Sequence, residues 1–187
     1  MMNTKTNTKK MTITALLTAI AITIPMIMPI KVIIGPASFT LASHVPIFLA
    51  MFLSPGIALI VALGATFGFF VAGFPIVIVM RALSHVGFVF VGSYLLKKNP
   101  EETLNSFGKS QLVSIAVALL HAIGETVIVS VFFFSGMVTD TSVGYLYSVL
   151  LLVGVGTFIH SIVDFLIARY VWKAIGNKMT SMLSPMY

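Results

Sequence analysis

The sequence contains no cysteine, which excludes a disulfide framework, a thiol nucleophile and a cysteine-ligated zinc site. Charged residues are also scarce, at 9% of 187 residues, whereas they make up about a quarter of a typical soluble domain. Hydrophobic residues account for 58% of the chain, and the mean hydropathy is +1.08. Because so few polar residues cannot cover a globule in water, we expect a multi-pass protein of the cell membrane.

The chain also lacks the glycine-rich P-loop of nucleotide hydrolases, so it is not expected to hydrolyse ATP itself. No Ser-His-acid arrangement stands out, and we predict neither an enzymatic activity nor a bound cofactor. Lysine and arginine number 11 against five acidic residues, but they do not form one stripe. This distribution disfavours nucleic acid as a partner and favours a lipid bilayer.

The apolar stretches predict an all-α fold of six transmembrane helices. A helix needs about 20 residues to cross the hydrocarbon core. The predicted spans form one domain over residues 1–187, after a short polar segment at 1–10, and cover residues 11–30, 41–53, 57–72, 76–96, 111–134 and about 144–172. The second span is short, so we expect it to be tilted, kinked at Pro46 or partly lining a cavity. Loops are predicted at 31–40, 97–110 and 135–142.

The basic residues orient these spans. Nine of the 11 fall on one side of the six-span topology: Lys5, Lys9, Lys10, Lys97, Lys98, Lys109, Arg169, Lys173 and Lys178. By the positive-inside rule that side is cytoplasmic, and both termini lie there. Lys31 and Arg81 are the two exceptions. No small-residue cleavage motif follows the first span, which we therefore expect to be retained.

Arg81 lies within a predicted span, in "VIVMRALSHVGFVFVGSYLL". An arginine at a helix centre costs roughly 2.5–3.5 kcal/mol, less near the interface, so it needs a reason. His85, four residues later, shares its helix face. Together the two side chains offer hydrogen-bond donors to a carboxylate. Snorkelling of Arg81 to the outer headgroups is the alternative.

A small-molecule pocket is predicted in the outer half of the membrane, where a few polar groups lie among aromatic ones. The apolar segment "KVIIGPASFTLASHVP" is expected to fold over it as a lid. Gly124 and Thr126 leave room beside Glu125. The predicted substrate-binding residues are Arg81, His85, Glu125, Phe39, Thr40, His44, Tyr145 and Tyr147.

Two pairs of histidine and acid have i, i+4 spacing: His121 with Glu125, and His160 with Asp164. Such spacing can place metal ligands on one helix face. No HExxH motif is present, and the pairs are expected at different depths, so we predict no metal. Interhelical hydrogen bonding is the preferred role for His160 and Asp164. An intramembrane metal-dependent enzyme is kept as an alternative function.

The motif "ALLTA" places Ala15 and Ala19 four residues apart on the first span. Small residues at this spacing let another helix approach closely. We predict a docking surface for a partner protein, with ordinary internal packing as the alternative.

With these features, residues 9–175 resemble a substrate-binding membrane subunit (S component) of an energy-coupling factor (ECF) vitamin transporter. The resemblance rests on the basic N-terminus, "ALLTA", the apolar lid segment, "FTLASHVPIFLAMFLSP" and six spans in under 200 residues. It implies that the alanine motif packs against a transmembrane coupling subunit and that two ATPase subunits drive transport. It further implies an outward-facing pocket and toppling of the whole subunit in the membrane.

Within that family, Arg81 and His85 favour a carboxylate vitamin over cationic thiamine. Pantothenate and niacin are both small carboxylates. The hydroxyl and amide groups of pantothenate would use more of the polar side chains, so pantothenate is ranked first and niacin is the alternative.

Overall fold

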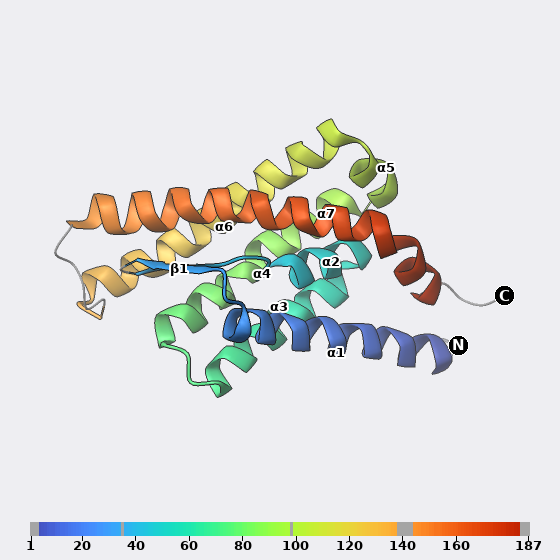
Figure 1. The fold of residues 1–187 in the computed structure, drawn as a ribbon, viewed down its shortest axis with the longest axis horizontal. Helices are drawn as coiled ribbons and strands as arrows, with labels where there is room; N and C mark the ends of the chain where they lie inside the picture. The colour runs from blue at the N-terminus through green and yellow to red at the C-terminus, as the bar shows by residue number, and fades with distance from the viewer. Residues whose placement is uncertain (1–3, 35, 98, 138–143, 184–187) are drawn as a thin grey trace.

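A computed structural model of the chain describes residues 4–34, 36–97, 99–137 and 144–183. It is a bundle of helices with one short antiparallel hairpin (Figure 1). In chain order the elements are α1 (Thr4–Ile27), β1 (Lys31–Ile34), β2 (Ala37–Thr40), α2 (Val45–Leu53), α3 (Pro55–Val71), α4 (Ile76–Leu96), α5 (Pro100–Asn105), α6 (Phe107–Phe134), the π-helical η1 (Leu146–Val155) and α7 (Gly156–Leu183).

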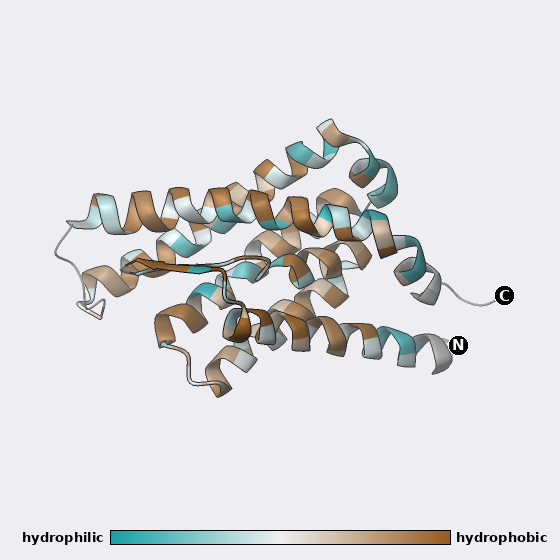
Figure 2. Cartoon of the chain, viewed as in Figure 1, coloured by the Kyte–Doolittle hydropathy of each residue, from teal (hydrophilic) through white to brown (hydrophobic). Residues whose placement is uncertain are grey.

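Among the described residues, four helices are long and apolar enough to cross a membrane, over Asn7–Ile27, Ile76–Leu96, Phe107–Phe134 and Leu146–Ser181. Apolar residues dominate their length, and hydrophilic ones gather mainly at one end of the bundle (Figure 2). The prediction of a helical, multi-pass membrane protein is thereby confirmed. Helix α3 is apolar but has only 17 residues. The count of six spans stays a prediction.

The second predicted span, 41–53, holds a helix that is even shorter than predicted, and its passage across the membrane stays a prediction. Helix α2 has nine residues, and every residue from Val45 to Phe52 is buried. At 1.5 Å per residue it is roughly 14 Å long, about half of the hydrocarbon thickness. It therefore lies inside the bundle rather than against lipid. Pro46 stands in its first turn, where a missing N–H is harmless, so it does not kink the helix.

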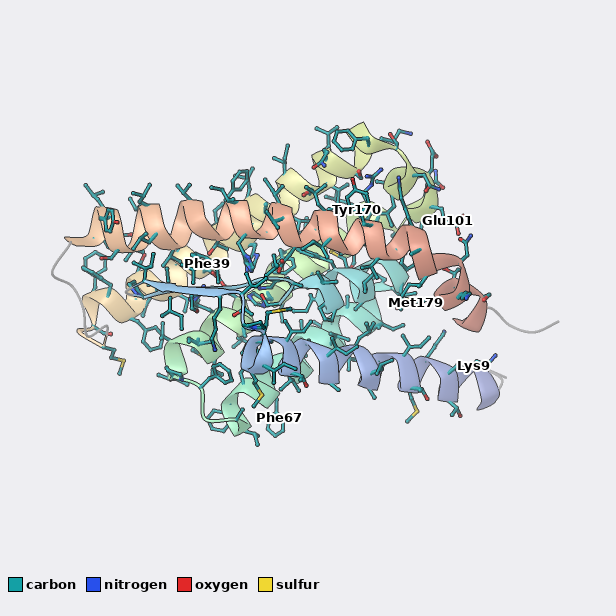
Figure 3. The ribbon with its side chains drawn as sticks, viewed as in Figure 1. Lys9, Phe39, Phe67, Glu101, Tyr170 and Met179 are labelled. Carbon is teal, nitrogen blue, oxygen red and sulfur yellow. The ribbon has the colours of Figure 1, made fainter. Side chains whose placement is uncertain are left out.

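The segment 31–40, predicted as a loop, is a β-hairpin. Strands β1 and β2 pair antiparallel, with Lys31 opposite Thr40 and Ile34 opposite Ala37. Strand pairing satisfies backbone groups that an irregular loop would leave unpaired in apolar surroundings. The ring of Phe39 fixes the hairpin against Gly156, where a Cβ atom would come within 2.5 Å of it. Phe39 accordingly lies beside α7 (Figure 3).

Asp164 of α7 anchors the junction between the hairpin and α2. Its Oδ1 accepts a hydrogen bond from the backbone N–H of Ala42 at 2.8 Å, and its Oδ2 accepts one from His44 N–H at 2.9 Å. Ala42 has φ 66°, an uncommon conformation for a residue other than glycine. Free N–H groups at a helix N-terminus need acceptors and favour a negative charge. The interhelical role predicted for Asp164 is confirmed.

Polar contacts around α5 stabilise the end of the bundle at which α6 begins. The predicted loop 97–110 contains α5 and the first turn of α6. Lys109 forms an ion pair with Glu102, and this hydrogen bond lowers the pKa of the exposed Glu102 carboxyl. Arg169 Nε donates to the carbonyl of Leu104 at 2.7 Å. The last span also runs beyond its predicted end, because α7 continues to Leu183.

The start of α1, the end of α7 and α5 lie at the same end of the molecule (Figure 1). Lys9 and Glu101 mark this end in Figure 3. This arrangement agrees with the predicted orientation, whose cytoplasmic side stays a prediction. Most of the predicted loop at 135–142 lies outside the described residues.

Single cysteines can test the orientation without background, because the chain has none of its own. Met137 is 67% exposed at the end opposite Lys109. We expect Met137→Cys to react with a membrane-impermeant maleimide in intact cells, and Lys109→Cys only after permeabilisation. Labelling of Lys109→Cys in intact cells would contradict the predicted orientation and place this end of the protein outside the cell.

Replacing Asp164 by alanine should destabilise the protein. It leaves the Ala42 and His44 N–H groups without their acceptor, and each buried unsatisfied donor costs about 1–3 kcal/mol. We expect a total loss of about 2–6 kcal/mol in the free energy of unfolding, measured in detergent. The exposed Glu102→Ala is the control and should change stability far less, because a solvent-exposed ion pair contributes little. Equal stabilities of the two variants would show that Asp164 does not anchor α2.

Candidate functional site

All four histidines of the chain gather at one place inside the bundle. The ring of His44 lies 4.8 Å from that of His85, 4.6 Å from His121 and 5.0 Å from His160, measured between centroids. They come from the N-terminus of α2 and from α4, α6 and α7 in turn. The two pairs of histidine and acid, expected at different depths, are therefore joined through His44.

Glu125 of α6 lies at the centre of this cluster. Its Oε2 accepts hydrogen bonds from Arg81 Nη2 at 2.8 Å and from Thr157 Oγ1 at 2.6 Å. Its Oε1 lies 3.3 Å from His85 Nε2 and 3.4 Å from His121 Nε2. The carboxylate thus joins α4, α6 and α7 through side chains alone.

Arg81 is buried, with 5% of its surface exposed, so it does not snorkel to the membrane surface. Its Nη1 donates to Pro36 O and Ser38 Oγ, both at 3.2 Å, and its Nη2 donates to Ser38 O at 3.3 Å. The guanidinium therefore holds the hairpin onto α4 while it pairs with Glu125. Its Nε is buried and has no hydrogen-bond partner among the described residues.

Asp164 carries a second function beside its backbone contacts. Its Oδ2 lies 3.1 Å from His44 Nδ1 and 3.3 Å from His160 Nε2, so it orients both rings. Ser43 Oγ also lies 3.2 Å from each of these two histidine nitrogens. His121 differs, because neither of its ring nitrogens forms a hydrogen bond with a described residue, although the ring is buried.

A cavity of about 140 Å³ lies between the hairpin, α1, α3 and the histidine cluster. Its lining is Ala21, Pro25, Lys31, Ile33, Ser38, Thr40, Ser43, His44, Ile47, Ala65, Phe69, Phe74, Ile78, Arg81, Ala82, His85, Glu125 and His160. Two of these side chains are cationic and one is anionic, which leaves one surplus positive charge when the histidines are neutral. The rings of Phe69 and Phe74 stack with centroids 4.8 Å apart.

Five of the eight predicted substrate-binding residues line this cavity: Thr40, His44, Arg81, His85 and Glu125. Phe39 packs behind the lining, with its ring 5.5 Å from that of His160. The hairpin supplies lining from both strands, in agreement with the predicted lid.

Two predicted residues and one predicted space lie elsewhere. Tyr145 bonds to Ser130 at 2.9 Å and packs among phenylalanines near the far end of α6, which satisfies its hydroxyl away from the cavity. Tyr147 is 47% exposed on the outer surface. The room expected beside Glu125 at Gly124 is taken by Ser84, whose Oγ would lie 3.3 Å from an added Cβ.

Sequence reasoning missed several residues of the site. Lys31 lines the cavity. Its position on the outer side of the predicted topology, away from most basic residues, was a signal that could have indicated this role. Thr157 bonds Glu125, and it shares a helix face with His160 and Asp164 at i+3 and i+7. That shared face was a usable signal for Thr157. Nothing in the local pattern indicated Phe69 or Phe74.

Ala15 and Ala19 are exposed on α1, while Leu17 and Ala21 are buried on its other face. The two alanines line a groove of about 720 Å³ between α1 and the start of α3, together with Gly56. Internal packing therefore does not account for them. The exposed groove supports the predicted docking surface.

Comparison with known proteins yields one informative similarity. The niacin transporter NiaX of Lactococcus lactis subsp. cremoris is 43% identical to this chain over 164 residues, which cover 88% of this chain and 73% of the relative. No family model matches the chain, and no solved structure matches it.

Sequence identity at this level, over most of both chains, shows the family of this membrane bundle with its hairpin-covered cavity. It also shows that the chain is a transport protein rather than an enzyme. The chain belongs to the S components of energy-coupling factor vitamin transporters.

Proposed function

We propose that this S component captures niacin in its acid form, nicotinic acid, within the cavity beneath the hairpin. The surplus positive charge of the lining carries the proposal, because a cavity with a cationic lining favours an anion. The volume of about 140 Å³ is well below the ~300–1,000 Å³ of pockets for drug-sized ligands, which suits a single small ring. The similarity to a niacin transporter supports the same choice.

Pantothenate, ranked first from the sequence, has no support from the comparison. The ranking assumed that many polar side chains are free to bind hydroxyl and amide groups. In the structure Ser38 and Thr157 are bonded to Arg81 and Glu125, and the tyrosines lie away from the cavity. Niacin, the alternative, needs fewer free polar side chains in the cavity.

In the proposed complex, the carboxylate of niacin binds between Lys31 and the guanidinium of Arg81, both of which line the cavity. Lys31 lines the cavity and forms no salt bridge with a residue that the structure describes. Arg81 Nε likewise has no hydrogen-bond acceptor among the described residues. The flat ring then lies against Phe69 and Phe74, since aromatic rings pack in offset or edge-on pairs.

In the proposed cycle, the pocket faces outward and the hairpin acts as its lid. The groove at Ala15 and Ala19 docks on the transmembrane coupling subunit, with two ATPase subunits supplying the energy. Toppling of the whole subunit then delivers the vitamin. The exposure of Ala15 and Ala19 in this groove, while Leu17 and Ala21 of α1 are buried, supports this division of roles.

Lys31→Gln should weaken binding of nicotinic acid without disturbing the fold, because the side chain is exposed at the hairpin. A hydrogen bond to a charged group contributes about 1.5–3 kcal/mol, so the Kd should rise roughly 10- to 150-fold. Calorimetry on detergent-purified protein measures the change. Lys97→Gln, an exposed lysine outside the cavity lining, is the matched control and should bind like the wild type.

Arg81→Lys should also lose affinity, because one ammonium cannot replace a guanidinium that already contacts Glu125 and the hairpin. Truncating a member of a desolvated charge pair costs on the order of 2–4 kcal/mol. Folded Lys31→Gln and Arg81→Lys variants with wild-type affinity would overturn the proposed placement of the carboxylate. Absence of nicotinic acid binding by the wild type would overturn the proposed function.

Tryptophan at Ala15 and Ala19 should fill the groove and block close helix approach. Vitamin uptake by cells should fall at least tenfold, while the purified variant binds vitamin with unchanged affinity. Val127→Trp, on an exposed face of α6, is the control. Normal uptake by the doubly substituted protein would show that α1 is not the docking surface.

A further inference from the structure

One group of side chains in the histidine cluster is arranged unlike an ordinary hydrogen-bond network. His44, His85, His121 and Glu125 each offer one ligand-type atom, and these atoms all lie within 4.8 Å of one another. All four residues are buried. Three imidazoles and one carboxylate form a donor set that suits zinc and related divalent metals.

The two distances from Glu125 Oε1 to histidine nitrogens match those between ligands of a tetrahedral ion. Two ligands at about 2.0–2.1 Å from a tetrahedral ion lie roughly 3.3–3.4 Å apart. Glu125 Oε1 is 3.3 Å from His85 Nε2 and 3.4 Å from His121 Nε2. The other carboxylate oxygen is occupied by Arg81 and Thr157, which leaves Oε1 to the two histidines.

His121 supplies an independent indication of a ligand. Its ring is 1% exposed, yet neither ring nitrogen has a hydrogen-bond partner among the described residues. A buried polar group without a partner costs about 1–3 kcal/mol, so such groups need an explanation. Its Nε2 lies 3.4 Å from Glu125 Oε1 without forming a hydrogen bond with it, and a metal ion between these two atoms would bind both.

The surroundings complete the pattern of a metal site. Metal-binding histidines commonly use their other nitrogen to donate to a carboxylate, which fixes the ring. His44 Nδ1 lies 3.1 Å from Asp164 Oδ2, so the Nε2 atom of the same ring remains for a metal. Asp164 also adds a negative charge that offsets part of the charge of a dication.

We infer that His44, His85, His121 and Glu125 bind one divalent metal ion of the zinc class in a tetrahedral site at the inner wall of the cavity. The site does not require the vitamin, because its four ligands all come from the chain. His44, His85 and Glu125 also line the cavity, so a bound dication would add positive charge beside an anionic occupant.

The test uses full-length protein in detergent, with any affinity tag removed and metal stripped by a chelator, in the absence of vitamin. Co²⁺ is the probe, since a tetrahedral Co²⁺ site gives intense visible absorption and an octahedral aqueous ion gives little. We expect one Co²⁺ per chain with the tetrahedral spectrum, and displacement by one equivalent of Zn²⁺. Absence of saturable binding, or binding with only the weak octahedral spectrum, would overturn the inference.

His121→Gln is the decisive variant, because His121 is outside the cavity lining. We expect at least a tenfold loss of Co²⁺ affinity and loss of the tetrahedral spectrum, with His85→Gln as the second variant should the first fail to fold. His160→Gln distinguishes the overlapping group of His44, His160 and Asp164. Binding that is abolished by His160→Gln and retained by folded His121→Gln would overturn the assignment.

Discussion

The buried ion pair between Arg81 and Glu125 is the interaction on which the rest of the structure depends. Arg81 attaches the hairpin to α4, and Glu125 attaches α6 to α7 through Thr157. Removing one partner of a buried pair leaves an uncompensated charge, at a cost of about 3–5 kcal/mol. The pair therefore acts as a fixed polar centre in a bundle whose other contacts are largely apolar, and it places the lid over the cavity.

The second carboxylate, Asp164, solves a different problem. A nine-residue helix that begins inside the bundle has a buried N-terminus, and water cannot satisfy its N–H groups there. Asp164 accepts the N–H of the N-cap residue His44 and that of Ala42 in the turn before it, and it orients His44 and His160 as well. Two of only five acidic residues in the chain thus organise the interior, which explains how so few charges suffice for a polar site.

The long helices were predictable from the sequence, and the short elements were not. The span 76–96 has the bounds of α4, because a long apolar run between turn signals admits one interpretation. The hairpin and the short extent of α2 within the predicted span 41–53 were not predicted, since a short apolar run fits a strand, a buried helix or a loop equally well. Arg81, His85 and Glu125 were found by their cost in a membrane. The convergence of His44 and His121 depends on contacts between distant segments, which spacing along one helix cannot reveal.

The central claim is that a cationic cavity beneath the hairpin selects the carboxylate of a small aromatic vitamin. The most direct measurement compares the affinities of the purified protein for nicotinic acid and for nicotinamide, which has the same ring but a neutral amide. The account predicts that nicotinic acid binds at least tenfold more tightly, a difference of about 1.4 kcal/mol or more. Equal affinities, or tighter binding of the amide, would contradict it.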